Sequence, residues 1–282
     1  MNILMEPQQK EQGRMLFPSS DLSIGWMPVG GSERSGSRLR CYIPCKSLQA
    51  DRIQSELYRP NARYDAVIFQ RRYGPADRSL AASLKTGHCK TILDLCDNDF
   101  YNPEGDPVKS EAITGLLEMV ERMDLITVSS VELQKVVSGI TETPVLVVEE
   151  YLDSIGPGLY QTISTAVAGA TKKIPGRRTK FVWFGYGQQR NPETGINHLQ
   201  DILPLLERLN QTFPLALSVI SNNRKKYVER VSRVSFPTRY FSWDRLSFNF
   251  LLSLHDICLI PIRKDPFTVC KSQNRLITAL LH

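Results

Sequence analysis

The stretch Tyr64-Asp-Ala-Val-Ile-Phe-Gln70 begins the segment that decides the fold. It is a short apolar run containing β-branched residues, and it predicts a buried strand. A helix is predicted next, over residues 75–86, and a further strand, Thr91-Ile-Leu-Asp-Leu95, follows it. Short buried strands that alternate with helices indicate a parallel sheet covered on both faces. We therefore predict an α/β fold.

The same alternation continues on both sides of this segment. A strand near the N-terminus runs into the glycine-rich stretch Gly30-Gly-Ser-Glu-Arg-Ser-Gly-Ser37, and a helix follows. Strand, glycine-rich loop and helix are the opening of a doubly wound unit. The further strands are predicted at residues 22–28, 124–128 and 144–148, and the further helices at residues 38–50 and 108–123.

The composition changes after residue 155. Residues 156–179 are rich in Gly, Pro, Ser and Thr and carry a basic cluster, which is typical of a linker between domains. The alternation then resumes, and 282 residues are long for one hydrophobic core. We predict a flexible tail (1–20), a Rossmann-like domain (21–155), the linker (156–179) and a second Rossmann-like domain (180–282). In the second domain, strands are predicted at 180–184, 215–220, 239–241 and 257–261, and helices at 195–210 and 246–254.

The charge of the chain is compatible with several kinds of partner. A net charge of +6 fits nucleic acid, an anionic membrane surface or a phosphorylated ligand. The aromatic residues show no RNP-like pattern, so no nucleic acid is predicted. No signal peptide and no apolar run of about 20 residues is visible, so we predict no transmembrane segment. The predicted location is the cytoplasm, with peripheral contact at the inner membrane surface possible through basic patches such as Arg224-Lys-Lys226.

Cysteine and histidine give no indication of a metal centre. The six cysteines contain no C-x-x-C pair, and the four histidines are scattered without metal-ligand spacing. We predict buried free thiols and no metal.

Ligands of open α/β sheets bind at the carboxyl ends of the strands. In the second half, Gly185 and Gly187 follow a strand, Trp243 precedes a helix, and the helix after residue 270 carries a cation, a hydroxyl and an amide in its predicted first turn. Unpaired N–H groups and cations at a helix start favour phosphate, and an aromatic ring can cover a base. A nucleotide diphosphate is therefore predicted, bound by Lys271, Ser272 and Asn274.

The first half supplies candidates for a second substrate. Arg38 and Arg71 are predicted to bind it, and Asp97, which follows a strand end, is the predicted general base. Ordinary alternatives exist for each residue: the arginines can be solvated, and Asp97 can cap a loop. Likewise Trp243 can pack in the core, and Gly185 can simply form a tight turn.

The order and spacing of these motifs resemble the GT-B glycosyltransferases, in particular the group 1 or family 4-like set. The resemblance covers roughly residues 22–282. Its motifs are Tyr64-Asp-Ala-Val-Ile-Phe-Gln-Arg71, Asp94-Leu-Cys-Asp-Asn98, Asp124-Leu-Ile-Thr-Val-Ser-Ser130, Phe181-Val-Trp-Phe-Gly185, His255-Asp-Ile-Cys-Leu-Ile-Pro261 and Lys271-Ser-Gln-Asn-Arg275.

The resemblance implies two Rossmann-like domains that face a cleft. It implies a nucleoside-diphosphate sugar held mainly by the second domain, an acceptor (glycan, lipid or protein) held mainly by the first, and transfer without a metal or other cofactor, as in polysaccharide biosynthesis. Gly185 matches the family's donor-side glycine loop, and Lys271, Ser272 and Asn274 match its phosphate-binding turn. Arg190 matches the second phosphate cation.

The chain also departs from the family pattern. Family 4 enzymes carry two glutamates eight positions apart, and Cys270 and Thr278 stand at those positions here, which argues against retaining family 4 chemistry. The family continues beyond the helix that ends at His282, so the second domain is expected to be incomplete. Two alternatives stay open: a noncatalytic or degenerate nucleotide-sugar-binding or interaction module, and a nucleotide-sugar epimerase of the same fold.

Overall fold

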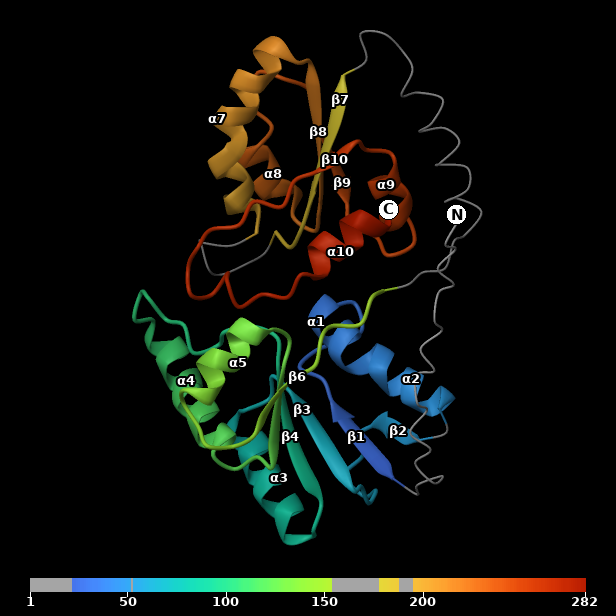
Figure 1. Cartoon of the computed structure of the whole chain (residues 1–282), viewed down its shortest axis with the longest axis vertical. Coiled ribbons are helices and arrows are strands. Elements are labelled where there is room, and N and C mark those ends of the chain that lie inside the picture. Colours follow the sequence, from blue (N-terminus) through green and yellow to red (C-terminus); the bar gives the residue numbers. More distant parts are fainter. Residues whose placement is uncertain (1–21, 52, 154–177, 188–194) are drawn as a thin grey trace, which may run out of the picture.

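A computed structural model describes residues 22–51, 53–153, 178–187 and 195–282. These residues form two α/β domains, shown one below the other in Figure 1. The predicted tail, almost all of the predicted linker and Arg190 lie outside the described residues.

The first domain is built on a parallel sheet whose described part has six strands in the order β2-β1-β3-β4-β5-β6. Val67 and Phe69 alternate along β3 and are fully buried, as expected for a strand covered by helices. Strand β2 was not predicted, because the stretch Gln-Ser-Glu-Leu is mostly polar and lies at the sheet edge. The strands are β1 (Ser23–Met27), β2 (Gln54–Leu57), β3 (Ala66–Gln70), β4 (Lys90–Leu95), β5 (Leu125–Val128) and β6 (Val145–Val147).

Helices cover both faces of this sheet (Figure 1). On one face lie α3 (Pro75–Thr86), α4 (Pro107–Val120) and α5 (Val131–Ser138), and on the other α1 (Ser35–Ser37), the π-helix η1 (Arg38–Tyr42) and α2 (Ile43–Ala50). The segment from α1 to α2 begins three residues earlier than the predicted start at residue 38. Ser130 caps α5 by accepting a hydrogen bond from the Leu133 N–H at 3.2 Å, as its position predicts.

The second domain repeats the architecture with four described parallel strands in the order β10-β7-β8-β9. Helices α7 and α8 pack on one face, and α9 and α10 on the other. The strands are β7 (Thr179–Phe184), β8 (Leu215–Ser221), β9 (Thr238–Ser242) and β10 (Ile257–Cys258), and the helices are α7 (Ile196–Thr212), α8 (Arg224–Arg230), α9 (Phe248–Ser253) and α10 (Asn274–Leu281).

Three expectations for the second domain are corrected. Strand β10 ends at Cys258, not at residue 261, and within the described part of the chain β7 is its one partner strand. Helix α8, which was not predicted, contains the basic stretch at residues 224–226 and begins at a cap where the Asn223 side chain accepts from the Lys226 N–H at 3.0 Å. Helix α10 begins at Asn274, so Lys271 and Ser272 precede the helix instead of forming its first turn.

The strand orders place one topological switch point in each domain. Successive connections leave in opposite directions from β1 and β3 in the first sheet, and from β7 and β10 in the second. Crevices at such points are the usual ligand sites of doubly wound sheets. Arg71 directly follows β3 and Gly185 directly follows β7, so these two predicted site residues lie at the carboxyl ends of strands that flank the switch points.

Several further expectations concern the chain as a whole. All six cysteines are free thiols and five are buried, as predicted. Within the described ranges, no helix is long and apolar enough to cross a membrane. Across those same residues, no group of three or more His, Cys, Asp or Glu side chains could hold a metal ion.

Candidate functional site

The two domains meet through the segment between β10 and α10, which reaches onto the first domain. The Asn98 side chain donates to the Pro266 carbonyl at 3.0 Å, and the Ser130 hydroxyl donates to the Cys270 carbonyl at 2.7 Å. The Cys270 side chain is 1% exposed and packs in the core of the first domain. Cys270, which stands at the family's first glutamate position, therefore anchors the segment. It holds Lys271 and Ser272 against the first domain.

Lys271 joins two of the residues predicted to act in the first domain. Its Nζ lies 2.8 Å from Asp97 Oδ1, and Asp97 Oδ2 accepts from Arg71 Nη1 at 2.7 Å. The Arg71 guanidinium also donates to Asp99, with Nε 2.8 Å from Oδ2. The predicted donor-site cation, general base and acceptor-site cation therefore form one ionic network across the domain junction.

Arg71 has an unusual backbone for its position. Its φ is 51°, in the left-handed region that a non-glycine residue rarely adopts. The Arg71 N–H donates to the Asp94 carbonyl at 2.9 Å, and the guanidinium is held by two carboxylates. A strained residue held by its surroundings is often found at a functional site. Here the conformation directs the guanidinium to the acids that follow β4.

The electrostatics of Asp97 favour the charged carboxylate. Burial alone would raise the pKa of Asp97, but the charges of Lys271 and Arg71 outweigh burial and hold that pKa below its ordinary value. Both of its carboxylate oxygens accept hydrogen bonds from cations. Such a group keeps its negative charge and is a weak proton acceptor; its role as general base stays a prediction.

A second link across the junction involves an acid that sequence reasoning missed. The Ser272 hydroxyl donates to Glu150 Oε2 at 2.6 Å. Burial raises the pKa of Glu150, and the hydrogen bond from Ser272 and the charge of Arg40 offset only part of that effect. Glu150 follows β6 in an irregular segment, beside another glutamate, so no motif distinguished it; its only sequence signal was its place just after a strand.

A third link joins Arg38 and Trp243, which were predicted to contact different substrates. The Arg38 guanidinium lies over the Trp243 ring, 5.6 Å from its centroid. Asp153 lies between the domains, 2.7 Å from Arg38 Nε and 3.0 Å from Arg245 Nη2. The ring also packs in the core of the second domain, against Phe248. In this structure both residues hold the domains together.

The glycine loop after β7 packs against the loop after β8. A Cβ on Gly187 would lie 2.6 Å from the Asn223 Cβ, and a Cβ on Gly185 would lie 2.8 Å from the Trp183 ring. The Gly187 N–H donates to the Asn222 side chain at 2.8 Å. Close packing within the domain therefore requires both glycines, whatever ligand lies beyond them. Their predicted contact with the donor stays a prediction.

The last predicted donor residue, Asn274, is the first residue of α10. Its side-chain oxygen accepts a hydrogen bond from the Thr278 hydroxyl at 3.4 Å, within the helix. Thr278 stands at the family's second glutamate position. The two residues thus contact each other, one turn apart, and Asn274 points along its own helix.

A cavity of about 600 Å³ adjoins the ionic network at the switch point of the first sheet. Arg71 forms part of its wall, as do Arg72 and Arg78. Burial, with Asp99 nearby, raises the pKa of Tyr73, which also lines the cavity, to about 12, so the phenol is neutral at pH 7 and can donate a hydrogen bond. Asp77 and Glu111 also line the cavity, and each of its three arginines is paired with a carboxylate. The lining therefore carries charges of both signs, and it suits a polar molecule with many oxygens.

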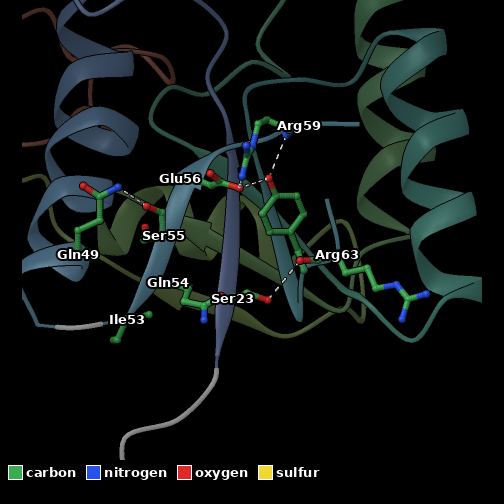
Figure 2. Close-up of a pocket in the computed structure, with 9 residues that line it drawn as sticks. Ser23, Gln49, Ile53, Gln54, Ser55, Glu56, Arg59 and Arg63 are labelled. Carbon is green, nitrogen blue, oxygen red and sulfur yellow. Dashed lines mark hydrogen bonds and ion pairs between the residues drawn. The ribbon is translucent and has the colours of Figure 1, made fainter. Parts of the chain in front are cut away.

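Another cavity, of about 430 Å³, lies beside the starts of β1 and β2 (Figure 2). Its central polar groups bond to one another: Tyr64 donates to Glu56 at 2.8 Å, and Arg59 Nη2 lies 2.6 Å from the same carboxylate. It lies at the amino ends of the strands, away from the switch point. None of the predicted site residues lines it.

Several solved structures resemble this arrangement, and a UDP-GlcNAc 2-epimerase from Neisseria meningitidis bound to UDP-GlcNAc is among them, with a TM-score of 0.40 and 11% identity over 84% of this chain and 76% of that chain. One described as trehalose-6-phosphate from E. coli bound with UDP-2-fluoro glucose has a TM-score of 0.50 and 12% identity, over 84% of this chain and 60% of that chain. A ugt transferase from Siraitia grosvenorii in complex with UDP has a TM-score of 0.48 and 8% identity, over 92% of this chain and 77% of that one.

No family model and no curated protein matches the chain by sequence. At 12% identity the likeness shows the fold alone, and that fold is GT-B, as the resemblance implied. The chain spans about 60% of the length of the E. coli structure.

Proposed function

We propose that this chain is a glycosyltransferase that transfers a sugar from a nucleoside-diphosphate donor to an acceptor at the domain junction. The observation that carries the proposal is that Lys271 and Ser272, which directly precede Gln273 and Asn274 at the start of α10, already hold carboxylates of the facing domain. A diphosphate offers the same kind of oxygen acceptor with more charge. It can therefore replace Asp97 and Glu150 on these two donors.

The acceptor side of the proposal rests on the cavity beside Arg71. The cavity adjoins Asp97 through the Arg71 guanidinium, so an acceptor bound there would lie close to a donor bound at Lys271. The cations and the start of α10 would stabilise the negative charge on the departing diphosphate, which needs no metal. The acceptor itself, a glycan, lipid or protein, is not specified by the cavity.

The test is a donor panel. UDP and GDP are titrated calorimetrically, and release of nucleotide from UDP-glucose and GDP-mannose is followed with water as the acceptor and then with candidate sugars. We expect saturable binding of one nucleotide and slow release from its sugar conjugate; UDP-glucose is tried first because the E. coli structure holds a UDP-sugar analogue.

The other outcomes separate the alternatives. Saturable binding without any release would support a noncatalytic nucleotide-sugar-binding module. Conversion of the donor sugar to its epimer would support an epimerase. If neither nucleotide binds, the proposed donor site is wrong.

A further inference from the structure

We propose that the acceptor carries a phosphate group, which binds at the start of the helix that follows β1. The inference rests on the proposed function and names the chemical class of the acceptor. The glycine-rich stretch at residues 30–37, which the proposed function does not use, leads into this helix. The helix runs without a break from Ser35 to Ala50 through α1, η1 and α2. It follows the carboxyl end of β1, which flanks the switch point of the first sheet.

The first turn of this helix offers backbone donors. The first N–H groups of a helix have no partner within the helix, and they favour an anion. Arg34 stands before the first turn, and within the described ranges no side chain caps this helix start. Ser35 is exposed and Gly36 is half-buried, so a ligand can reach the turn from solvent. Many helix starts share these features, and a buried donor beside it distinguishes this one.

The buried donor is the side-chain amide of Gln70, the last residue of β3. Gln70 is 0% exposed. Its Oε1 accepts hydrogen bonds from the Val29 N–H and from the Ser37 hydroxyl, each at 3.1 Å. Among the residues that the structure describes, its Nε2 has no hydrogen-bond partner. A buried donor without a partner costs free energy, and an oxygen atom of a ligand would remove that cost.

The unpaired amide lies next to the first turn of the helix. A Cβ added to Gly36 would lie 3.9 Å from Gln70 Nε2 and 3.6 Å from Cys96 Sγ. Apart from the chain neighbours of Gly36, no other described side chain comes within 4 Å of that position. Space for one further atom therefore remains between the amide and the helix start. A phosphate oxygen placed there would accept from Gln70, while the other oxygens accept from the N–H groups of the first turn.

The helix start adjoins the cavity that we assign to the acceptor. Val29 and Arg71 line that cavity, and Gln70 is bonded to Val29 and directly precedes Arg71. Asp97, which follows Cys96, has both carboxylate oxygens paired with cations, so it repels an anion less than an unpaired carboxylate would. A phosphate presents three oxygens to this set of donors, whereas a carboxylate presents two. The polar body of the acceptor can therefore occupy the cavity while its phosphate binds the helix start.

The experiment compares Gly36→Ala with Gly139→Ala. Neither glycine has a positive φ, and a Cβ at either position meets other atoms only at 3.5 Å or more, so both variants should fold. Only in Gly36→Ala does the added methyl group fill the space beside Gln70. Inorganic phosphate is titrated by phosphorus NMR into chain saturated with UDP, so that the proposed donor site is occupied. The dissociation constant for phosphate is expected to rise about tenfold or more in Gly36→Ala and to stay within about twofold in Gly139→Ala.

A second variant removes the donor itself. Gln70→Glu keeps an acceptor for Val29 and Ser37 and replaces the unpaired amide by an oxygen, so phosphate binding should weaken by a similar factor. No phosphate binding by the wild-type chain, or equal binding by the wild-type chain and Gly36→Ala, would overturn the inference. Weaker UDP binding in Gly36→Ala would place the helix start in the donor site and would also overturn it. If the wild-type chain binds no UDP, the proposed function fails, and the phosphate titration without UDP still decides whether the helix start binds the anion.

Discussion

Asp94 and Asp97 lie three residues apart at the end of β4, and each pairs with cations, yet their surroundings differ. The side chains of Arg40 and Asp94 are 3% and 4% exposed, and both belong to the first domain. The side chains of Lys271 and Asp97 are 30% and 19% exposed, and they belong to different domains. The first pair is enclosed within one domain, whereas the second can be opened by an anion that competes for the lysine. The Arg40–Asp94 pair therefore stabilises the fold, whereas the Lys271–Asp97 pair, by our proposal, opens to bind a ligand.

The largest expected effect is on the enclosed pair. Asp94→Ala leaves the Arg40 guanidinium buried without its partner and also removes the acceptor of the Thr127 hydroxyl, which lies 2.7 Å from Asp94 Oδ1. We expect the free energy of unfolding to fall by about 3–5 kcal/mol, measured by urea denaturation. Replacing both charges, with Arg40→Met and Asp94→Leu, should cost less than Asp94→Ala alone. If the double variant has the lower free energy of unfolding, the ion pair stabilises the fold more than a buried ion pair usually does.

The next effect concerns the pair between the domains. Lys271→Ala is expected to weaken UDP binding by about 1–3 kcal/mol, because a charge-assisted contact to the diphosphate is lost. Isothermal titration calorimetry measures this change. Lys264→Ala is the matched control, since it removes an exposed cation from the same segment and should leave the affinity unchanged. Equal affinities for UDP in the wild-type chain, Lys271→Ala and Lys264→Ala would exclude Lys271 from the donor site.

Removing the carboxylate that binds Lys271 should have the opposite effect on the affinity for UDP. Asp97→Asn removes the carboxylate that competes for Lys271, and we expect UDP to bind more tightly by about 0.5–1.5 kcal/mol, the size of a typical hydrogen-bond exchange. Asp99→Asn serves as the control, because it leaves the contact between Lys271 and Asp97 in place. Weaker binding in Asp97→Asn would mean that Asp97 orients Lys271 instead of competing with the ligand.

The smallest expected effect is the response to acid. The folded-state pKa of Asp97 is lowered by Lys271 and Arg71 despite burial, so its charge stabilises the fold above the ordinary aspartate pKa of about 4. That contribution is lost as the pH falls through the lowered folded-state pKa. Urea denaturation between pH 6 and pH 3 should therefore show a steeper loss of stability in the wild-type chain than in Asp97→Asn. Parallel curves would show that Asp97 contributes little to holding the domains together.

Much of the fold could be predicted because its strands are short, apolar and bounded by turns. The predicted bounds of α3 match the structure. Strand β2 was missed because a polar edge strand lacks the apolar pattern of a buried one. Helix α8 was missed because its first turn is basic, which favoured interpretation as a surface patch.

The candidate site was only partly predictable. Residues at strand ends could be identified one by one, since a doubly wound sheet gathers its strand ends at one edge. The sequence separation of 174 residues between Lys271 and Asp97 carries no signal that they touch. Glu150 had no motif around it, and its importance depends on Ser272, which lies 122 residues away.

The sequence by itself determined the α/β class, the two-domain plan and the residue types at the strand ends, because hydrophobic periodicity and turn residues act locally. The tertiary structure alone decided which of those residues meet. It brings Lys271 to Asp97, Ser272 to Glu150 and Arg38 to Trp243. The physical reason is that packing, burial and charge pairing depend on the docking of two domains, and no local pattern in either domain encodes that docking.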